Sequence, residues 1–299
     1  RVKWFANALP SKEVHSQMKI KNDNMVIVIQ CTDSVGLVAA ISRVLANAGC
    51  NIVSMREHVD QEENKFFARI VVENITDPQG IEVTITNVLP ENAVVKVNPL
   101  PEKNIVVLVT REYHCLSDIL TRNHFKTLGA NVQCVIGNHP DLMNITKRFD
   151  IPFHLVSHQN KSNETFEKEL MDVISPYKPD YLVLAKFMRI LSQDFISAFK
   201  MKIINIHHSF LPAFTGASPY RKAYVRGVKI IGATAHFVTT DLDEGPIITQ
   251  QIIPVNHSFT LQDMVKAGRE NETAALAKAM QLVFEDRVFV YNNKTVVFE

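Results

Sequence analysis

Apolar and polar positions in the first hundred residues alternate in a way that predicts a small mixed domain. Four short, β-branched apolar runs predict strands: 25–31, 51–59, 66–72 and 93–97. Two stretches with apolar residues at helical spacing predict helices: 37–48, which Gly49 ends, and 80–89. The order βαββαβ predicts a ferredoxin-like sheet with two helices on one face.

The pattern changes after a proline-containing linker at 98–104. Continuous apolar runs then alternate with helical segments, and the runs are 105–109, 132–136, 153–156, 181–184 and 203–206. The clearest helix is 164–174, with Asn163 as its predicted cap. This alternation predicts a mostly parallel, Rossmann-like α/β sheet that is covered on both faces.

The end of the chain extends the second pattern. It predicts two further strands, a long helix and a hairpin: 230–238, 247–255, 260–285 and a turn through Asn292 and Asn293. A length of 299 residues also favours two domains over one. We therefore predict an α/β protein with domains at 20–98 and 105–299.

Composition narrows the function classes. Hydrophobic residues make up 46% and charged residues 21%, and the formal net charge is only +1. Such a balance argues against nucleic acid or an anionic membrane as the main partner. No apolar stretch reaches the ~20 residues that a membrane span needs. The four cysteines are too far apart for a metal or disulfide framework, so we expect reduced thiols, a cytoplasmic protein and no metal cofactor.

The first twelve residues carry three basic and no acidic side chains. This bias permits a remnant of a transit peptide, although an irregular N-terminal arm is the preferred interpretation.

Candidate chemistry gathers near the end of the strand predicted at 203–206. Asn205 and His207 are two residues apart, so their side chains should leave the same face, and His208 should point the opposite way. Asp243 follows the strand that carries His236. An Asn, a His and an Asp without a metal set suggest acid–base catalysis at a carbonyl. Taken singly, a strand-end histidine is more often a packing residue, and an Asp before Glu-Gly-Pro, as Asp243 is, is usually a turn former.

The complete set of motifs is more specific than its members. The motifs are Asn205-x-His207, Ser209-x-Leu211-Pro212, His236-Phe-Val238 and Leu242-Asp-x-Gly-Pro246. Together they resemble the folate-dependent formyltransferase family, and the resemblance covers residue 105 to the C-terminus. It implies a formyltransferase fold and 10-formyltetrahydrofolate as the substrate, with no separate cofactor.

The resemblance also implies roles for individual residues. Asn205 would donate a hydrogen bond to the formyl oxygen. His207, paired with Asp243, would stabilise the tetrahedral intermediate and move protons, and Asp243 would orient and deprotonate the attacking group. His236 would support the site. The folate-binding residues would be Met188, Arg189, Ile190, Leu191, Val238 and Thr239. A basic residue is expected near Ser218, whereas this sequence has Arg221 and Lys222, so the hold on the folate glutamate tail stays open.

The N-terminal domain carries a second resemblance. The segments Asp33-Ser-Val-Gly-Leu37 and Gly49-Cys-Asn-Ile52 resemble an ACT domain. That family implies a homo-oligomer and a possible amino-acid effector site between two copies, with Asp33, Gly36, Leu37 and Asn51 as candidates. The alternative is that Gly36 only permits the turn and that the domain only dimerises.

The nucleophile distinguishes the branches of the formyltransferase family. The loop after the first catalytic strand, Thr110 to Leu116, has no glycine with which to hold a substrate phosphate, and Glu112 would repel one. No basic C-terminal domain for tRNA follows either. The ACT domain together with these motifs resembles the branch that uses water and releases formate and tetrahydrofolate. The expected role is to balance one-carbon folates and to supply formate for purine synthesis.

Three other functions remain for comparison. A formyltransferase with an unidentified amine acceptor is the main alternative. A folate- or amino-acid-binding regulator without turnover is the second, although the intact trio argues against it. A nicotinamide dehydrogenase is set aside because no G-x-G-x-x-G motif follows a strand.

Overall fold

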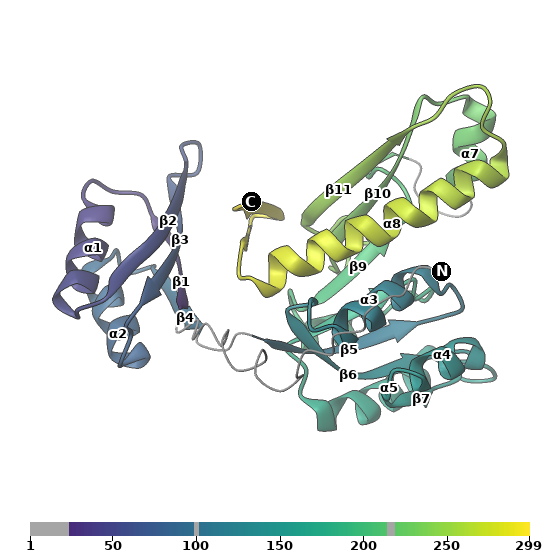
Figure 1. The fold of residues 1–299 in the computed structure, drawn as a ribbon, viewed down its shortest axis with the longest axis horizontal. Coiled ribbons are helices and arrows are strands. Elements are labelled where there is room, and N and C mark those ends of the chain that lie inside the picture. Colours follow the sequence, from purple (N-terminus) through teal and green to yellow (C-terminus); the bar gives the residue numbers. More distant parts are fainter. Residues whose placement is uncertain (1–23, 99–101, 214–218) are drawn as a thin grey trace, which may run out of the picture.

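Two β-sheets organise the computed structural model, which describes residues 24–98, 102–213 and 219–299 (Figure 1). The N-terminal arm and Ser218, on which two expectations rest, lie outside these ranges. No helix within them is long and apolar enough to cross a membrane. The fold class is confirmed: an antiparallel four-stranded sheet precedes a mostly parallel seven-stranded one.

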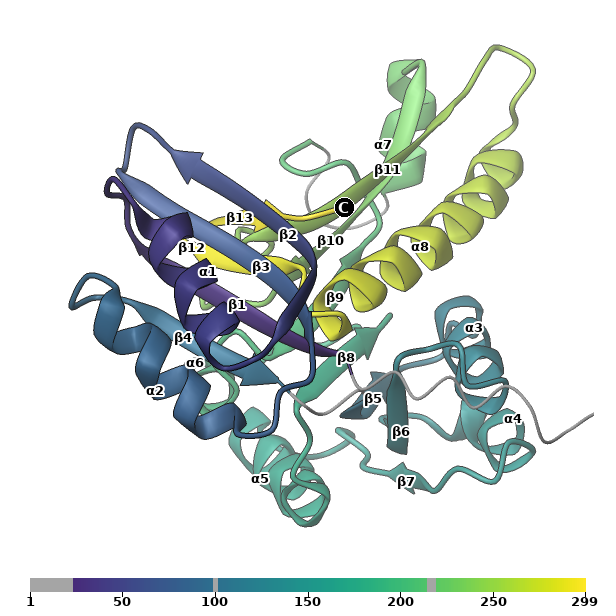
Figure 2. The ribbon, with the colours of Figure 1, turned by 60° about the vertical axis from the view of Figure 1, so that its left-hand side comes forward.

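The N-terminal sheet has the strand order β2-β3-β1-β4, in which every pair is antiparallel. Its strands are β1 (Met25–Thr32), β2 (Asn51–Asp60), β3 (Lys65–Glu73) and β4 (Val94–Asn98). Helices α1 (Leu37–Asn47) and α2 (Pro78–Val88) lie together on one side of it (Figure 2). Helix α2 starts two residues before the predicted position because Asp77 accepts a hydrogen bond from the Gly80 N–H and Pro78 suits the first turn.

The second sheet has the order β11-β10-β9-β8-β5-β6-β7. Its strands are β5 (Lys103–Val109), β6 (Ala130–Gly137), β7 (Phe153–Leu155), β8 (Tyr181–Ala185), β9 (Ile203–His207), β10 (Ile230–Phe237) and β11 (Ile247–Pro254). The five strands from β7 to β9 are parallel, whereas β10 and β11 are antiparallel to their neighbours.

Helices cover both faces of this sheet. They are α3 (His114–His124), α4 (Met143–Lys147), α5 (Asn163–Ile174), α6 (Gln193–Ala198), α7 (Pro219–Arg226) and α8 (Leu261–Phe284), with short 3-10 turns at Pro140–Leu142 and Ser175–Tyr177. One apolar core joins α3 and α8 to the strands, and another joins α5 and α6. Burial on both faces explains why these strands are continuous apolar runs.

A C-terminal hairpin connects the two parts of the molecule. It consists of β12 (Val288–Tyr291) and β13 (Lys294–Val297) and lies between the N-terminal sheet and β11 (Figures 1 and 2). The buried ring of Phe67 on β3 lies 5.7 Å from that of Phe289 and 5.6 Å from that of Tyr291, measured between centroids. Arg69 also donates two hydrogen bonds, of 3.1 and 2.9 Å, to the carbonyl oxygen of Glu285.

The predicted cap of α5 is wrong by one residue. Ser162 has extended backbone angles, and its hydroxyl accepts a hydrogen bond of 3.2 Å from the Thr165 N–H. Asn163 is instead the first helical residue, and its amide donates to Glu167 at 3.1 Å. Both residue types are good caps, so the sequence alone did not distinguish them.

We expect Ser162→Ala to lower the free energy of unfolding by about 1 kcal/mol, because an N–H at the helix start loses its acceptor. Ser162→Asp keeps an acceptor there and should stay close to the wild type. Thermal and urea unfolding measure both variants. A Ser162→Ala protein as stable as the wild type would show that this cap is unimportant.

Candidate active site

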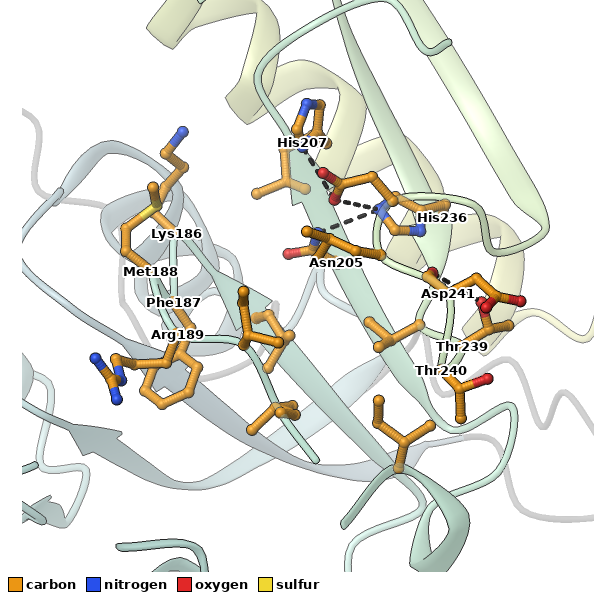
Figure 3. Close-up of a pocket in the computed structure, with 18 of the residues that line it drawn as sticks. Lys186, Phe187, Met188, Arg189, Asn205, His207, His236, Thr239, Thr240 and Asp241 are labelled. Atoms are coloured by element: carbon orange, nitrogen blue, oxygen red, sulfur yellow. Dashed lines mark hydrogen bonds and ion pairs between the residues drawn. The ribbon is translucent and has the colours of Figure 1, made fainter. Parts of the chain in front are cut away.

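One cavity of about 400 Å³ brings the predicted catalytic and folate-binding residues together (Figure 3). It lies against the segment after β8, the end of β9, and the loop between β10 and β11. Its lining includes all the residues to which the sequence assigned these roles: Met188, Arg189, Ile190, Leu191, Asn205, His207, His236, Val238, Thr239 and Asp243.

The pairing of β9 with β10 sets the position of Asn205. The antiparallel register places Asn205 opposite His236, and the Asn205 Nδ2 atom lies 3.2 Å from the His236 Nε2 atom. The other ring nitrogen of His236, Nδ1, lies 2.9 Å from the carbonyl oxygen of Phe237. That carbonyl can only accept, so Nδ1 carries the proton and Nε2 accepts from the Asn205 amide. This fixes the amide with its N–H groups on the His236 side, and one N–H stays available for a ligand.

The state of His236 agrees with this hydrogen-bond pattern. Burial lowers the pKa of His236, although its contact with the Phe237 carbonyl opposes the shift. A neutral ring has the lone pair that the Asn205 amide needs. His236 is thus in hydrogen-bond contact with Asn205, and its supporting role stays a prediction.

His207 and Asp243 form the second contact of the site. The His207 Nδ1 atom lies 3.2 Å from the Asp243 Oδ1 atom, and the His236 Nε2 atom lies 3.9 Å from the same oxygen. A hydrogen bond from His207 lowers the pKa of Asp243, burial opposes this, and the charges of His207, His236 and His208 lower it further. The Asp243 carboxylate is thus ionised at neutral pH. The His207 Nε2 atom is buried and has no hydrogen-bond partner among the described residues.

The loop 238–246 folds back over the sheet to bring Asp243 to His207. Strand β10 runs antiparallel to β9, so its carboxyl end at Phe237 lies beside Ile204 rather than beside His207. Asp243 has a φ of 59°, a left-handed conformation that Asp tolerates better than most residues. A β-carbon on Gly245 would clash with the Phe237 carbonyl, so only glycine fits this close return of the chain.

The prediction that His208 points away from the site is wrong. Its ring centroid lies 4.9 Å from that of His207, and His208 also lines the cavity. Strand β9 ends at His207, and the alternation of faces applies only within a strand. Burial and the charge of Lys186 lower the pKa of His208 to about 4, so its ring is neutral.

The predicted pterin edge divides into exposed and buried positions. The side chains of Met188 and Ile190 are exposed, whereas Leu191 is buried in the core beside α5. The Met188 N–H donates to the Thr110 hydroxyl at 2.9 Å, so this backbone donor is already used. Arg221 and Lys222 lie on α7, outside the described lining of the cavity.

Comparison with known proteins gives the family. Residues 103–280 match the model of the family "Formyl transferase", and residues 25–84 match that of the ACT domain. The chain is 47% identical over 267 residues to a formyltetrahydrofolate deformylase of Escherichia coli (strain K12), covering 89% of this chain and 95% of that protein. The chain belongs to the formyltetrahydrofolate deformylase family.

Solved structures agree with this assignment. A formyltetrahydrofolate deformylase from Pseudomonas syringae pv. tomato str. DC3000 has a TM-score of 0.88 and 38% identity, covering 92% of this chain and 94% of that one. A glycinamide ribonucleotide transformylase 1 from Symbiobacterium toebii has a TM-score of 0.63 and 29% identity, covering 66% of this chain and 95% of that one.

A buried polar network beside the deformylase-family site escaped the sequence analysis. Glu272 on α8 is fully buried. Its carboxylate oxygens lie 2.8 Å from the His114 Nε2 atom, 3.0 Å from the Lys186 Nζ atom and 2.6 Å from the Tyr220 hydroxyl. Lys186 and His208 also line the cavity, so the network adjoins the cavity through Lys186. The helical spacing that buries Gly268 and Ala275 places Glu272 on the same face, which was the available signal.

The same group contains three residue types that can bind metals, namely His114, Cys115 and Glu272. The Lys186 ammonium occupies one Glu272 oxygen and the Tyr220 hydroxyl occupies the other. Burial raises the pKa of Cys115, so its thiol is protonated and is a poor ligand. We therefore interpret the group as an ion-pair network.

The candidate effector residues of the N-terminal domain do not converge within one chain. Asp33 and Gly36 follow the end of β1, where Thr32 pairs with Lys65. Asn51 is at the opposite end of the sheet and donates to Glu73 at 3.2 Å. Leu37 is buried in the domain core. Gly36, with a φ of 94°, is exposed at the start of α1.

We expect Glu272→Gln to destabilise the protein in a pH-dependent way. Burial alone would raise the pKa of Glu272, but His114, Lys186 and Tyr220 lower it from 4.5 to about 2. The stability that ionisation of Glu272 contributes is therefore fully present above pH 4.5 and is lost as the pH falls toward 2. Glu272→Gln should lose most stability at neutral pH and progressively less below about pH 4.5.

Urea unfolding of the wild type and Glu272→Gln between about pH 7 and pH 3.5 measures this difference. Asp118→Asn is a matched control, because Asp118 forms an ion pair with Arg122 on the surface of α3. A Glu272→Gln difference that is the same at every pH would contradict the proposed charge state.

Proposed function

We propose that this chain hydrolyses 10-formyltetrahydrofolate to formate and tetrahydrofolate. The observation that carries the proposal is the placement of Asn205, His207 and Asp243 around one cavity, in a chain 47% identical to a deformylase. Water adds to the formyl carbon, the bond from that carbon to N10 breaks, and N10 receives a proton. One proton of the water reaches N10, and the other is released to solvent when formate leaves as an anion. The formyl oxygen is negatively charged in the tetrahedral intermediate, so the reaction needs an oxyanion donor and a proton carrier. Its cellular role would be to balance one-carbon folates and to supply formate for purine synthesis.

Asn205 is assigned to the formyl oxygen. The oxygen gains negative charge when water adds, and a fixed N–H donor stabilises this charge more in the transition state than in the substrate. The contact with the neutral ring of His236 holds the Asn205 amide, so the donor is oriented before the substrate binds. Loss of such a donor costs on the order of a hundredfold in rate.

His207 and Asp243 are assigned to proton transfer. The Asp243 carboxylate accepts from the Nδ1 side of His207, which leaves the Nε2 atom of His207 to exchange a proton with the reacting groups. The negative charge of Asp243 favours the protonated imidazole that forms when water loses its proton. The second carboxylate oxygen of Asp243 would orient the water. Met188 to Leu191, Val238 and Thr239 would hold the folate.

The contacts of the 110–116 loop support water over an amine carrying a phosphate. Glu112 forms an ion pair of 2.9 Å with Arg269, and His114 contacts the Glu272 carboxylate. Arg111 lies 3.2 Å from the His139 ring. A phosphate would have to displace these partners and would meet the Glu112 charge. The transferase alternative remains testable by a direct assay.

We also propose that residues 20–98 act as an effector-binding domain beside a catalytic domain at 105–299. The match to the ACT domain supports a small-molecule effector, and an amino acid is the finer proposal. Because Asn51 and Gly36 lie at opposite ends of one sheet, a site using both needs two copies of the chain. This arrangement supports a homo-oligomer.

We expect Asp243→Asn to lower kcat by on the order of a thousandfold while the affinity for folate stays close to that of the wild type. The amide is the same size but loses the charge that a protonated His207 requires. Glu244→Gln is the matched control, because it makes the same change at an exposed position of the same loop. Steady-state kinetics and folate titration measure both variants, and near-normal turnover by Asp243→Asn would refute the mechanism.

The deciding experiment is an assay of formate release from 10-formyltetrahydrofolate with no amine acceptor and with a metal chelator present. Stoichiometric formate and tetrahydrofolate are the expected result. Folate binding without formate, followed by formyl transfer once a candidate amine is added, would establish a transferase instead. Folate binding without either product would indicate a regulator.

A further inference from the structure

We propose that Asn293, in the turn of the C-terminal hairpin, is a positioning residue for Asp243, and that the N-terminal sheet supports the hairpin in this role. The inference deepens the proposed hydrolysis and rests on it. The hairpin belongs neither to the cavity lining nor to the motifs of the sequence.

The loop that carries Asp243 is held from outside by the hairpin at two carbonyl groups. The Asn293 Nδ2 atom donates to the Glu244 carbonyl oxygen at 2.8 Å. The Thr295 hydroxyl donates to the Ile247 carbonyl oxygen at 2.5 Å. Glu244 directly follows Asp243, and its carbonyl belongs to the peptide between Glu244 and Gly245, so the first contact fixes the chain one residue after Asp243. The second fixes the chain where the loop enters β11.

The loop needs such support because of its own geometry. It leaves β10 at the end remote from His207 and must return over the sheet. Asp243 has the left-handed backbone conformation, which free loops adopt rarely outside glycine. Within the loop, the Glu244 N–H reaches the Asp241 carbonyl at a long 3.3 Å. The contact with Asn293 is shorter and comes from a separate element.

The hairpin is itself held by the N-terminal sheet. Phe289 and Tyr291 on β12 pack on Phe67 of β3, and these rings form one apolar cluster with Phe298. Figure 2 shows β12 and β13 between the N-terminal sheet and β11. A continuous set of contacts therefore runs from Phe67, through the hairpin, to the carbonyl of Glu244, the residue after Asp243.

The turn offers a matched pair of substitutions. Asn292 and Asn293 both have positive φ, 43° and 58°, so glycine fits the backbone at either position. Within residues 219–299, Asn293 donates to the loop and Asn292 makes no hydrogen bond to it. Asn293→Gly and Asn292→Gly thus make the same change in the same turn, and only the first removes the contact. Asn293→Asp removes the N–H donor by a second route and keeps the side-chain size.

We expect Asn293→Gly and Asn293→Asp to lower kcat roughly three- to tenfold, because a small displacement of a catalytic group costs rate and a single hydrogen bond is modest. Adding Thr295→Val should extend the loss to more than about tenfold. KM for 10-formyltetrahydrofolate and the melting temperature should stay close to those of Asn292→Gly. Wild-type formate release, measured in parallel, tests the proposed function separately.

The pH profile distinguishes positioning from a general loss of structure. The groups that face the Asp243 carboxylate are His207 on β9, His208 just after it, and His236 on β10. A less firmly held Asp243 makes a weaker hydrogen bond with His207, so its pKa rises toward the ordinary value. The acid limb of kcat should then move to higher pH in both Asn293 variants and not in Asn292→Gly.

The contribution of the N-terminal sheet is tested by Phe67→Leu, which keeps the position apolar but removes the ring contacts with Phe289 and Tyr291 of the hairpin. A fall in kcat and a shift of the acid limb in the same direction as in Asn293→Gly would support it. Unchanged kinetics in Phe67→Leu would overturn this half of the inference. Equal kinetics for Asn293→Gly and Asn292→Gly would overturn the role of Asn293 itself.

Discussion

The antiparallel pairing of β10 with β9 is the constraint on which the site depends. It sets Asn205 opposite His236, so that a backbone register orients the amide assigned to the formyl oxygen. It also carries the chain away from His207, since the carboxyl end of β10 lies beside Ile204. The loop must therefore fold back to bring Asp243 within 3.2 Å of His207. The left-handed Asp243 and the close approach at Gly245 follow from this return.

Burial determines which groups around His207 and Asp243 are charged. Burial lowers the pKa values of His236 and His208, so both rings are neutral at neutral pH. Asp243 keeps its charge because the hydrogen bond from His207 opposes the effect of burial. One carboxylate thus lies among three histidine rings, of which only His207 is within hydrogen-bonding distance of it. A proton taken from water would accordingly reside on His207.

The sequence predicted the parts of this arrangement that are local or carried by motifs. Continuous apolar runs are sufficient to indicate buried parallel strands, and the motif resemblance placed Asn205, His207 and Asp243 in one site. The orientation of His208 and the cap at Ser162 were missed because each depends on where an element ends by a single residue. Asn51 starts β2 at the end of the sheet opposite to the end of β1 that Gly36 follows, and this separation depends on how the strands pair with β3.

The choice between water and an amine depends on long-range contacts of the same kind. Asn205, His207 and Asp243 would polarise the formyl group equally well for either nucleophile, so the trio does not decide the acceptor. The decision depends on whether side chains near the cavity could hold the phosphate of an acceptor. Beside the cavity, Glu272 from α8 binds His114 from α3 and Lys186, which directly follows β8, and the three segments are far apart in the sequence. The Glu272 carboxylate is already paired with the Lys186 ammonium and the His114 ring, so this network has no free cation for an acceptor phosphate. A water molecule needs no such group, and this difference favours hydrolysis.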